Sequence, residues 1–495
     1  MKQFAKSSVC FLLLAVLTFG MFACGETTDP ETTTDNAVVT TETPVETENL
    51  YDENGYLKDD IPSDLLFNRD FTLLYWSDRE HEEFYAETET GEAVSDAIFK
   101  RNSNVAERLG ITWQYATEPG KATSATIAGF TTKVEASKNS GEGAYDMIAA
   151  HSYTIGNCAV KGLTTDLMQL QYLNWEKPWW PYKLIGQATI NNKLFFASGD
   201  ISANVIYMMY VTFFNREMIQ DRNLEDPYEL VKNKKWTIDK MFEMCSGIYE
   251  DKDGSGTPTI GDLYGQYAYD LHLDIFIAGC GVTFIDTSTG EPKINEDFTG
   301  DKLVDICGKV TDFFKSHDRA YLLTENNDTS QWFSKGLSLF WSDRCRNANR
   351  FKNDEIIQFG IIPNPMYDEN QDGYATVLGN PFSLYAIPTD ASDKNCSAAV
   401  METYASESYR ILSPQLYEVT MKYRFTDDST SAEMFDVIRS SVVFDLGRIF
   451  STNFKSPYGT FEDAISSGIA WTRAAAANKK NTWPKALDTL LEAFA

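Results

Sequence analysis

The twelve residues from Asp251 to Asp262, DKDGSGTPTIGD, have the oxygen-rich spacing of a cation-binding loop. Oxygen donors stand at loop positions 1, 3 and 5, a glycine at position 6 and a carboxylate at position 12, the spacing by which a tight loop wraps Ca²⁺. The final donor is Asp rather than the longer Glu, so a solvated acidic turn is the alternative. Because one loop would supply every ligand, the pattern predicts a structural Ca²⁺ site rather than a catalytic metal. The expected ligands are Asp251, Asp253, Ser255, Thr257 through its carbonyl, and Asp262.

A second group of candidate residues follows short apolar runs at several places in the chain. An indole face can stack on the C–H face of a pyranose, while Asp and Arg bond its hydroxyls. Trp180 adjoins Trp179, and neighbours on an extended chain point to opposite sides, so only one of the two could face a given pocket. Packing within the core is the alternative for each tryptophan. The candidate ligand-binding residues are Trp76, Asp78, His151, Tyr153, Trp180, Trp341, Asp343 and Arg344.

Composition and motifs argue against several classes of function. The formal charge of −29 argues against nucleic acid as a partner, because the phosphate backbone is also negative. The sequence has no nucleophile elbow, phosphate loop or HExxH motif, and its four histidines are isolated, so we expect neither an enzyme nor a zinc site. With 72 acidic residues, a facing pair of carboxylates as in a glycoside hydrolase stays open as an alternative. The cysteines from Cys158 to Cys396 are widely spaced and predict no particular disulfide.

The N-terminus has the features of an export signal. Lys2 and Lys6 precede an apolar run that is too short to span a bilayer, and Cys24 follows a small residue. This arrangement resembles bacterial lipoprotein signals, which implies a signal peptide over residues 1–23 and a lipid, such as palmitate, on Cys24. A plain secreted chain is the alternative. Residues 24–65 are rich in Thr and Glu and poor in apolar side chains, which predicts a disordered acidic tether.

The order of elements after the tether indicates an α/β fold. Apolar runs of strand length at 71–76, 111–115 and 145–150 alternate with helical patterns at 92–109 and 125–138. This alternation predicts a parallel sheet with ligands near the carboxyl ends of its strands. The chain beyond the tether is too long for one core, so we expect two lobes.

Several segments resemble the family 1 extracellular solute-binding proteins of ABC importers, the relatives of maltose-binding protein. The segment FGIIPNPMYDENQDGYATVLGNPFSLYAIPTDASDKNCSAA begins at Phe359 as a strand that should end at Pro363, because proline removes a ladder donor. It resembles the segment in which a strand leaves one lobe and the chain returns into the other. YDMIAAHSYTIGNCAVKGLTTDL, from Tyr145, is similar to the strand that ends in the cleft. TENNDTSQWFSKGLSLFWSDRCRN, from Thr324, is similar to the strand that delivers Trp341, Asp343 and Arg344 there.

The resemblance implies a two-lobed periplasmic-binding-protein-like fold of type II, with the ligand cleft between lobes that close by hinge motion. It places the N-terminal lobe at 66–163 and 364–410 and the C-terminal lobe at 164–363 and 411–495. The implied function is capture of a solute, which the aromatic content suggests is an oligosaccharide, and delivery to an ABC permease by a monomer lipid-anchored on the outer face of the cytoplasmic membrane. An exported carbohydrate-active enzyme and a binding subunit that feeds a sensor kinase are the alternatives.

Overall fold

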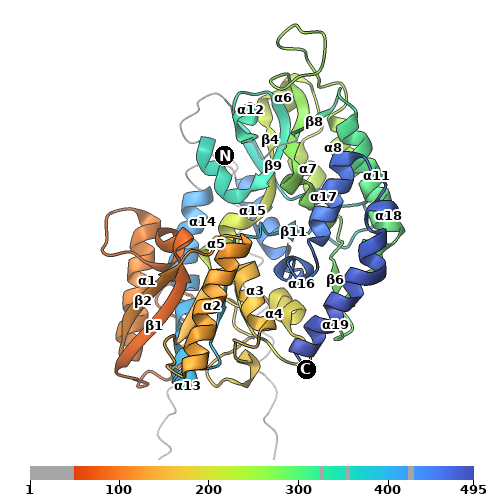
Figure 1. Cartoon of the computed structure of the whole chain (residues 1–495). Coiled ribbons are helices and arrows are strands. Elements are labelled where there is room, and N and C mark those ends of the chain that lie inside the picture. The colour runs from red at the N-terminus through yellow and green to blue at the C-terminus, as the bar shows by residue number, and fades with distance from the viewer. Residues whose placement is uncertain (1–49, 324–327, 352–356, 422–428) are drawn as a thin grey trace, which may run out of the picture. The chain divides into compact units, whose positions relative to one another are not determined.

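Two separate β-sheets organise the folded part of the chain, as the computed structural model shows (Figure 1). The structure describes residues 50–323, 328–351, 357–421 and 429–495. Residues 51–495 form one compact unit. The expected signal peptide, Cys24 and residues 24–49 of the expected tether lie outside the described residues. Residues 51–65 belong to the compact unit, where Ile61 is buried and Asp59 pairs with Arg108, so the prediction of disorder is wrong for this part of the tether. No helix among the described residues is both long and apolar enough to cross a bilayer.

The first sheet has the strand order β12-β3-β1-β2, in which β1 runs parallel to β2 and β3, and β12 is antiparallel to β3. Helix α1 begins where Glu92 accepts a hydrogen bond from the Ser95 amide, and it ends at Gly110, whose φ of 62° suits glycine. The strands are β1 (Arg69–Trp76), β2 (Ile111–Glu118), β3 (Met147–His151) and β12 (Ser383–Ala386), and the helices are α1 (Ala93–Leu109), α2 (Ser124–Ser140), α3 (Ser152–Val160) and α13 (Lys394–Glu407). We call this sheet and its helices the first lobe. Its β1-α1-β2-α2-β3 order confirms the α/β prediction.

The second sheet has the order β10-β4-β9-β5-β8, with β5 parallel to β8 and β9, and with β4 antiparallel to β9 and β10. Its strands are β4 (Tyr210–Asn215), β5 (Tyr264–Tyr269), β8 (Ala320–Leu323), β9 (Ser338–Arg344) and β10 (Phe359–Ile362). The helices of this second lobe are α6 (Arg216–Asp221), α7 (Pro227–Lys232), α8 (Ile238–Met244), α9 (Asp274–Ala278), α10 (Glu296–Thr299), α11 (Asp301–Lys315), α12 (Ser330–Ser334), α15 (Ser429–Ser440), α16 (Leu446–Ile449), α17 (Pro457–Ser467), α18 (Trp471–Ala474) and α19 (Trp483–Ala493). Two short pairs accompany it, β6 (Ile285–Asp286) with β7 (Lys293–Ile294) and β11 (Thr376–Val377) with β13 (Val442–Val443).

Two passages of the chain between the lobes lie side by side. The first runs through α5 (Ala203–Met208) into β4, and the second leads from β11 to β12. Met209 and Leu378 form an antiparallel bridge, and the Gly379 amide donates to the Met208 carbonyl at 2.7 Å. The two lobes are therefore joined at Met208–Met209 and Leu378–Gly379.

These positions correct the predicted lobe boundaries at both passages. The predicted boundary after residue 163 assigns the next segment to the second lobe, but Ala197 exchanges two 2.9 Å backbone hydrogen bonds with Tyr385 of β12, so this segment adjoins the first sheet. Pro363 does end β10 as expected, yet the chain stays on the second lobe, where Asn364 donates to the Tyr210 carbonyl. Helix α14 (Ser413–Met421), also predicted in the second lobe, packs on α1.

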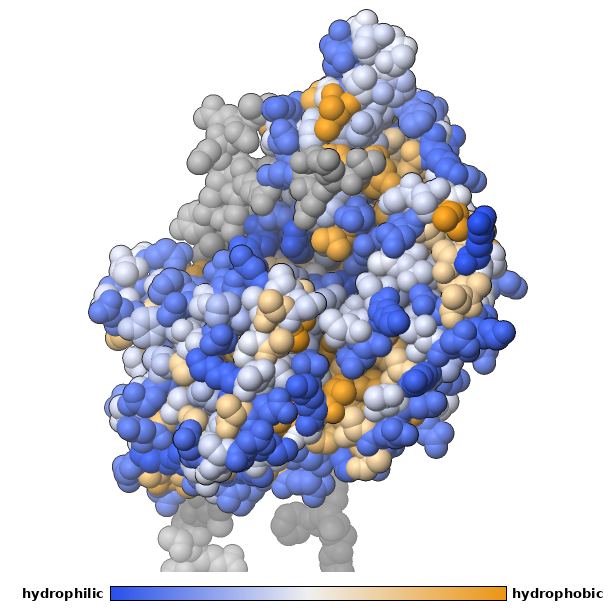
Figure 2. Space-filling model, viewed as in Figure 1, coloured by the Kyte–Doolittle hydropathy of each residue, from blue (hydrophilic) through white to orange (hydrophobic). Residues whose placement is uncertain are grey.

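The surface of the folded unit is mostly hydrophilic, with hydrophobic residues in separate spots on the face drawn in Figure 2. The exposed large hydrophobic side chains of the described residues are scattered rather than contiguous. They are Leu50, Tyr51, Leu66, Met168, Tyr182, Ile260 and Ile469. The six cysteines from Cys158 to Cys396 are free and buried, so none of them forms a disulfide.

Candidate functional site

The carboxyl ends of the parallel strands bring polar and aromatic side chains to one edge of each sheet. In the first lobe these ends are Trp76 of β1 and His151 of β3, and Ser383 of the antiparallel β12 pairs in register with His151. In the second lobe β5 ends at Tyr269 and β9 at Arg344, and Arg344 pairs with Tyr210 at the start of β4. These two edges hold most of the residues predicted to bind ligand.

Trp76 forms the buried end of β1 rather than an exposed stacking surface. Its indole N–H donates to Ser383 Oγ at 3.0 Å, and its ring meets the edge of the His151 ring. A Cβ on Gly120 would lie 2.4 Å from the Trp76 Cβ, so only glycine allows the loop after β2 to approach so closely. Trp76 therefore supports the edge of the first sheet through packing.

His151 and Tyr153 lie at the start of α3. His151 Nδ1 accepts a hydrogen bond from the Tyr153 amide at 3.1 Å, which caps the helix. Burial, assisted by the nearby Arg79 guanidinium, lowers the pKa of His151 to about 3, so the ring is neutral at physiological pH. Tyr153 is half-buried, and burial raises the pKa of its hydroxyl although Arg448 opposes this rise.

Asp78 fixes the loop that follows β2. Its Oδ2 accepts a 2.9 Å hydrogen bond from the Gly120 amide, and its Oδ1 lies 3.6 Å from Lys121 Nζ. These partners leave Asp78 partly exposed beside the end of β1. Asp78 therefore fixes the backbone of the loop at Gly120 while its side chain stays partly accessible to a ligand.

The Asp343 carboxylate holds Arg344 in place at the end of β9. Asp343 Oδ1 accepts from the Arg344 amide at 2.6 Å and from Arg344 Nε at 3.1 Å, while Oδ2 accepts from Asn347 at 2.7 Å. Burial alone would raise the pKa of Asp343, but His272 and Arg344 outweigh burial and lower it, so the group is an anion. Arg344 keeps about a quarter of its side chain exposed, 23%, and can present the rest of its guanidinium to a ligand.

A largely buried polar cluster near this edge includes Arg448, Asp274 and Glu462, which no local sequence pattern indicates. Arg448 of α16 pairs with Asp274 of α9, donates to the Leu378 carbonyl at 3.0 Å, and lies over the Tyr458 ring. Burial and the neighbouring Asp274 carboxylate raise the pKa of Glu462 to about 10, so this carboxyl is protonated at neutral pH and can donate a hydrogen bond. The cluster thus offers a cation and a neutral acid beside the passage at Leu378.

A further contact joins the two edges. The π-helical turn η2 (Glu80–Phe84) is anchored by Glu83, which accepts hydrogen bonds from Tyr385 in β12 and from Asn204 in α5. Glu82 on the same turn pairs with Arg79 at 3.1 Å and with Arg346, which follows β9, at 3.1 Å. One carboxylate therefore contacts arginines from both lobes.

No protein-family model matches the chain, and no curated protein matches it. Solved structures do match. UspC from Mycobacterium tuberculosis aligns with a TM-score of 0.55 at 13% identity, covering 84% of this chain and 99% of that one. An ABC substrate-binding protein from Listeria monocytogenes, in complex with cycloalternan, aligns with a TM-score of 0.54 at 13% identity over 85% and 99% of the two chains. The maltose-binding protein MalE of the same organism, in complex with maltose, gives 0.54 at 12% identity over 85% and 98%.

This chain has the two-lobed fold of the ABC solute-binding proteins. The expected type II fold is thereby confirmed, and the two sheets, their joined passages and the facing polar edges are its parts. Within the solute-binding fold, the structure brings Asp78, His151 and Tyr153 to the first edge and Asp343 and Arg344 to the second. Tyr269 and Tyr210 are further aromatic residues at the second edge, and their positions at strand ends could have indicated them.

Trp341, predicted to meet ligand in this solute-binding fold, belongs to the core of the second lobe. Its side chain is fully buried, its ring stacks on Phe213 and Phe333, and its indole N–H donates to Thr329 Oγ1 at 2.7 Å. The prediction is wrong because β9 lies inside its sheet with both faces covered, so Trp341 points into packed side chains.

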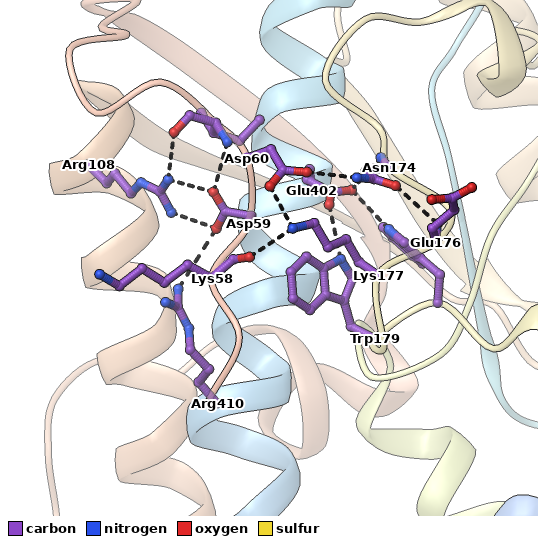
Figure 3. A network of polar contacts seen from close by, with 12 residues as sticks. Lys58, Asp59, Asp60, Arg108, Asn174, Glu176, Lys177, Trp179, Glu402 and Arg410 are labelled. Atoms are coloured by element: carbon purple, nitrogen blue, oxygen red, sulfur yellow. Dashed lines mark hydrogen bonds and ion pairs between the residues drawn. The ribbon is translucent and has the colours of Figure 1, made fainter. Parts of the chain in front are cut away.

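Trp180 is likewise a structural residue. Its indole N–H donates to Glu402 at 2.9 Å, and that of Trp179 donates to the other carboxylate oxygen at 3.1 Å. Figure 3 shows Glu402 beside Trp179 and Asn174, and Asp59 between Arg108 and Arg410. Both tryptophans bind α13 of the first lobe, so the prediction that Trp180 contacts ligand is wrong.

The loop from Asp251 to Asp262 gathers its acids as a cation site requires. Carboxylate oxygens of Asp251, Asp253 and Asp262 lie within 4.8 Å of one another. Hydrogen bonds from Ser255 and Thr259 lower the pKa of Asp253 to about 2, so it is ionised at neutral pH. The Ser255 hydroxyl donates to the Thr257 carbonyl at 2.9 Å, so these two predicted ligands bind each other here. Three converging carboxylates fit a hard divalent cation.

Proposed function

We propose that this chain is an extracellular solute-binding lipoprotein that captures an oligosaccharide and passes it to an ABC permease. The observation that carries the proposal is the arrangement of two lobes joined at Met209 and Leu378, with polar and aromatic side chains at the facing strand ends. Hinge closure of such lobes buries a ligand between them. The cargo class rests on the solved neighbours that hold cycloalternan, maltose or maltotriose.

The residues at the two edges suit a ligand rich in hydroxyl groups. The guanidinium of Arg344 is planar and can donate several hydrogen bonds, and the Asp78 carboxylate can accept them. Tyr210 and Tyr269 lie buried behind Arg344 at the same strand ends. A neighbour with another kind of cargo is UgpB from Mycobacterium tuberculosis in complex with glycerophosphocholine, with a TM-score of 0.51 at 13% identity, so polar alcohols with a phosphate belong in the same panel.

Thermal unfolding of the full chain with a panel of oligosaccharides, glycerophosphodiesters and peptides tests the function. A ligand at about 100 times its dissociation constant adds roughly 2.7 kcal/mol to the free energy of unfolding. Stabilisation by one glycan class, with the glycan recovered unchanged, supports a carrier. Conversion of the glycan to product contradicts the carrier and favours the alternative of an exported carbohydrate-active enzyme.

The lipid anchor, the permease and the monomeric state are parts of the same proposal. Mass spectrometry of the exported protein would show a diacylglyceryl group on Cys24, and a Cys24→Ser variant would leave the membrane fraction. Co-purification with a permease supports import, whereas co-purification with a sensor kinase supports the alternative role as a sensory subunit.

We also propose that the loop from Asp251 to Asp262 binds Ca²⁺ as a structural clamp. Its three carboxylates would coordinate the ion, and the ion would relieve their mutual repulsion and fix the loop ahead of β5. The loop leads into the strand that ends at Tyr269, so the ion would stabilise one side of the second lobe rather than take part in chemistry.

A further inference from the structure

A cavity of about 680 Å³ lies beside the two passages, apart from the strand ends that form the proposed solute site. Small-molecule sites commonly have volumes of about 300–1,000 Å³. One wall comes from the segment at Pro178–Lys183, from Gly199–Asp200 and from α5, and the other from α15 and Val442–Phe444. Met209, which forms the bridge to Leu378, is part of its lining.

Most of the lining is apolar. Proline rings contribute from one wall, and branched or aromatic side chains contribute from the other wall and from α5. The apolar lining residues are Pro178, Pro181, Val205, Ile206, Met209, Val437, Val442 and Phe444. Such a surface favours the hydrocarbon or aromatic body of a ligand because burial removes both surfaces from water.

The charged lining residues differ in how well they are paired. Asp200 is half-buried, and its Oδ1 accepts from Arg439 at 2.8 Å and from Ser413 at 2.6 Å. Asp436 accepts from the Tyr417 hydroxyl at 2.6 Å and is exposed. Both acids on the lining thus already have donors, so neither requires a cationic ligand.

Lys183 is a lining cation whose ammonium has hydrogen-bond donors to spare. Its ammonium donates only to the Ser440 carbonyl, at 3.4 Å, and forms no ion pair with any residue in the described ranges. The side chain is half-buried, and burial lowers its pKa. A half-buried ammonium with one long hydrogen bond gains from a carboxylate or similar anion placed next to it.

We propose that this cavity is a second ligand site, for a small amphipathic molecule with one anionic head at Lys183 and an apolar body between α5 and β13. The site is independent of the oligosaccharide proposed for the strand ends. Because its two walls belong to segments packed on different lobes, an occupant contacts both of them.

Isothermal titration of the full chain with octanoate tests the site, with 1-octanol as the neutral-head comparison. Saturable one-site binding of octanoate is expected, with 1-octanol at least tenfold weaker. Lys183→Met keeps an aliphatic side chain of similar length and removes the charge, so it should lower the affinity for octanoate at least tenfold. Lys100→Met, on the exposed face of α1, is the matched control and should bind octanoate as the parent does.

Absence of saturable octanoate binding to the parent chain would overturn the proposal, as would equal affinity in Lys183→Met and the parent. A Val437→Trp variant fills the cavity from α15 and should also abolish octanoate binding. Undiminished binding in this variant would mean that octanoate binds elsewhere on the chain and would contradict the proposal. Lys183→Met should still bind the oligosaccharide, as measured by the increase in its thermal unfolding temperature. This control separates a failure of the cavity site from a failure of the solute site.

Discussion

Arg346 and Glu82 form an ion pair between the lobes, with Nη2 of the arginine 3.1 Å from Oε1 of the glutamate. Glu82 lies on the turn that Glu83 anchors to β12, and Arg346 follows β9. The pair therefore favours the relative lobe orientation seen here over one in which the two edges separate.

Arg346→Met should weaken ligand binding, because it removes a contact that holds the edges together. A partly exposed ion pair contributes about 0.2–1 kcal/mol, which corresponds to a loss of affinity of roughly 1.4- to 5-fold. Titration calorimetry with the cargo found by thermal screening checks this. Arg222→Met is the control, since Arg222 pairs with Glu250 inside the second lobe. Equal affinities in both variants would show that the interlobe pair has no part in closure.

Trp341 and Arg344 lie three residues apart on β9 and should respond differently to substitution. Trp341→Ala leaves a large cavity in the core, and we expect a loss of about 3–5 kcal/mol in the free energy of unfolding. Arg344→Gln keeps a donor for Asp343 while it removes the charge, so the affinity of the protein for its cargo should fall about 10- to 100-fold. Urea unfolding and calorimetry of both variants check this, and full cargo affinity in Arg344→Gln would remove Arg344 from the site.

Glu402 should make stability depend on pH. Burial raises its pKa to about 8 in the folded chain from the ordinary 4.5, although the indole N–H groups of Trp180 and Trp179 oppose the rise. Between those values the folded state keeps a proton that the unfolded state releases, so the free energy of unfolding falls as pH rises, by at most about 1.4 kcal/mol per unit. Stability from this proton is fully present below pH 4.5 and is lost above about pH 8.

Glu402→Gln cannot titrate, so the difference in unfolding free energy between the parent and this variant should shrink as pH rises from 5 to 8. Urea unfolding at several pH values within that range measures the difference. A difference that does not change with pH would mean that Glu402 is ionised throughout, held so by its three N–H donors.

Calcium should raise the thermal unfolding temperature of the parent chain, and a chelator should reverse the increase. Asp253→Asn removes one carboxylate of the three and should weaken Ca²⁺ binding at least tenfold, because hard cations depend on charged oxygen ligands. Asp64→Asn, an exposed acid outside the loop, should bind Ca²⁺ as the parent does. Identical melting curves with Ca²⁺ and with chelator would show that the loop is only an acidic turn.

The sequence predicts the first lobe well because its signals are local. The predicted strand at 71–76, helix at 92–109 and strand at 111–115 correspond to β1, α1 and β2, which follow one another within fifty residues. Pro363 marked the end of β10 for the same reason. Where the chain then goes is set by long-range hydrogen bonds, such as that from Asn364 to the Tyr210 carbonyl, which spacing does not reveal.

The candidate site was predicted only in part for a similar reason. Asp343 and Arg344 are the last two residues of β9 and come directly after its apolar part, so their place at the strand end could be predicted. Arg448 meets Asp274 across 174 positions of the chain, and Trp180 meets Glu402 across 222, and no local pattern connects them. Burial of Trp341 on an interior strand is also a property of the assembled sheet rather than of the strand's own sequence.

The placement of the tryptophans has a spectroscopic consequence. All ten tryptophan side chains are buried or half-buried. The indole N–H groups of Trp76, Trp341 and Trp180 donate to Ser383, Thr329 and Glu402. Their emission should be blue-shifted and protected from aqueous quenchers, and a bound solute would leave it almost unchanged. The proposed closure of the two lobes is therefore better followed with a pair of dyes, one on each lobe, than with intrinsic fluorescence.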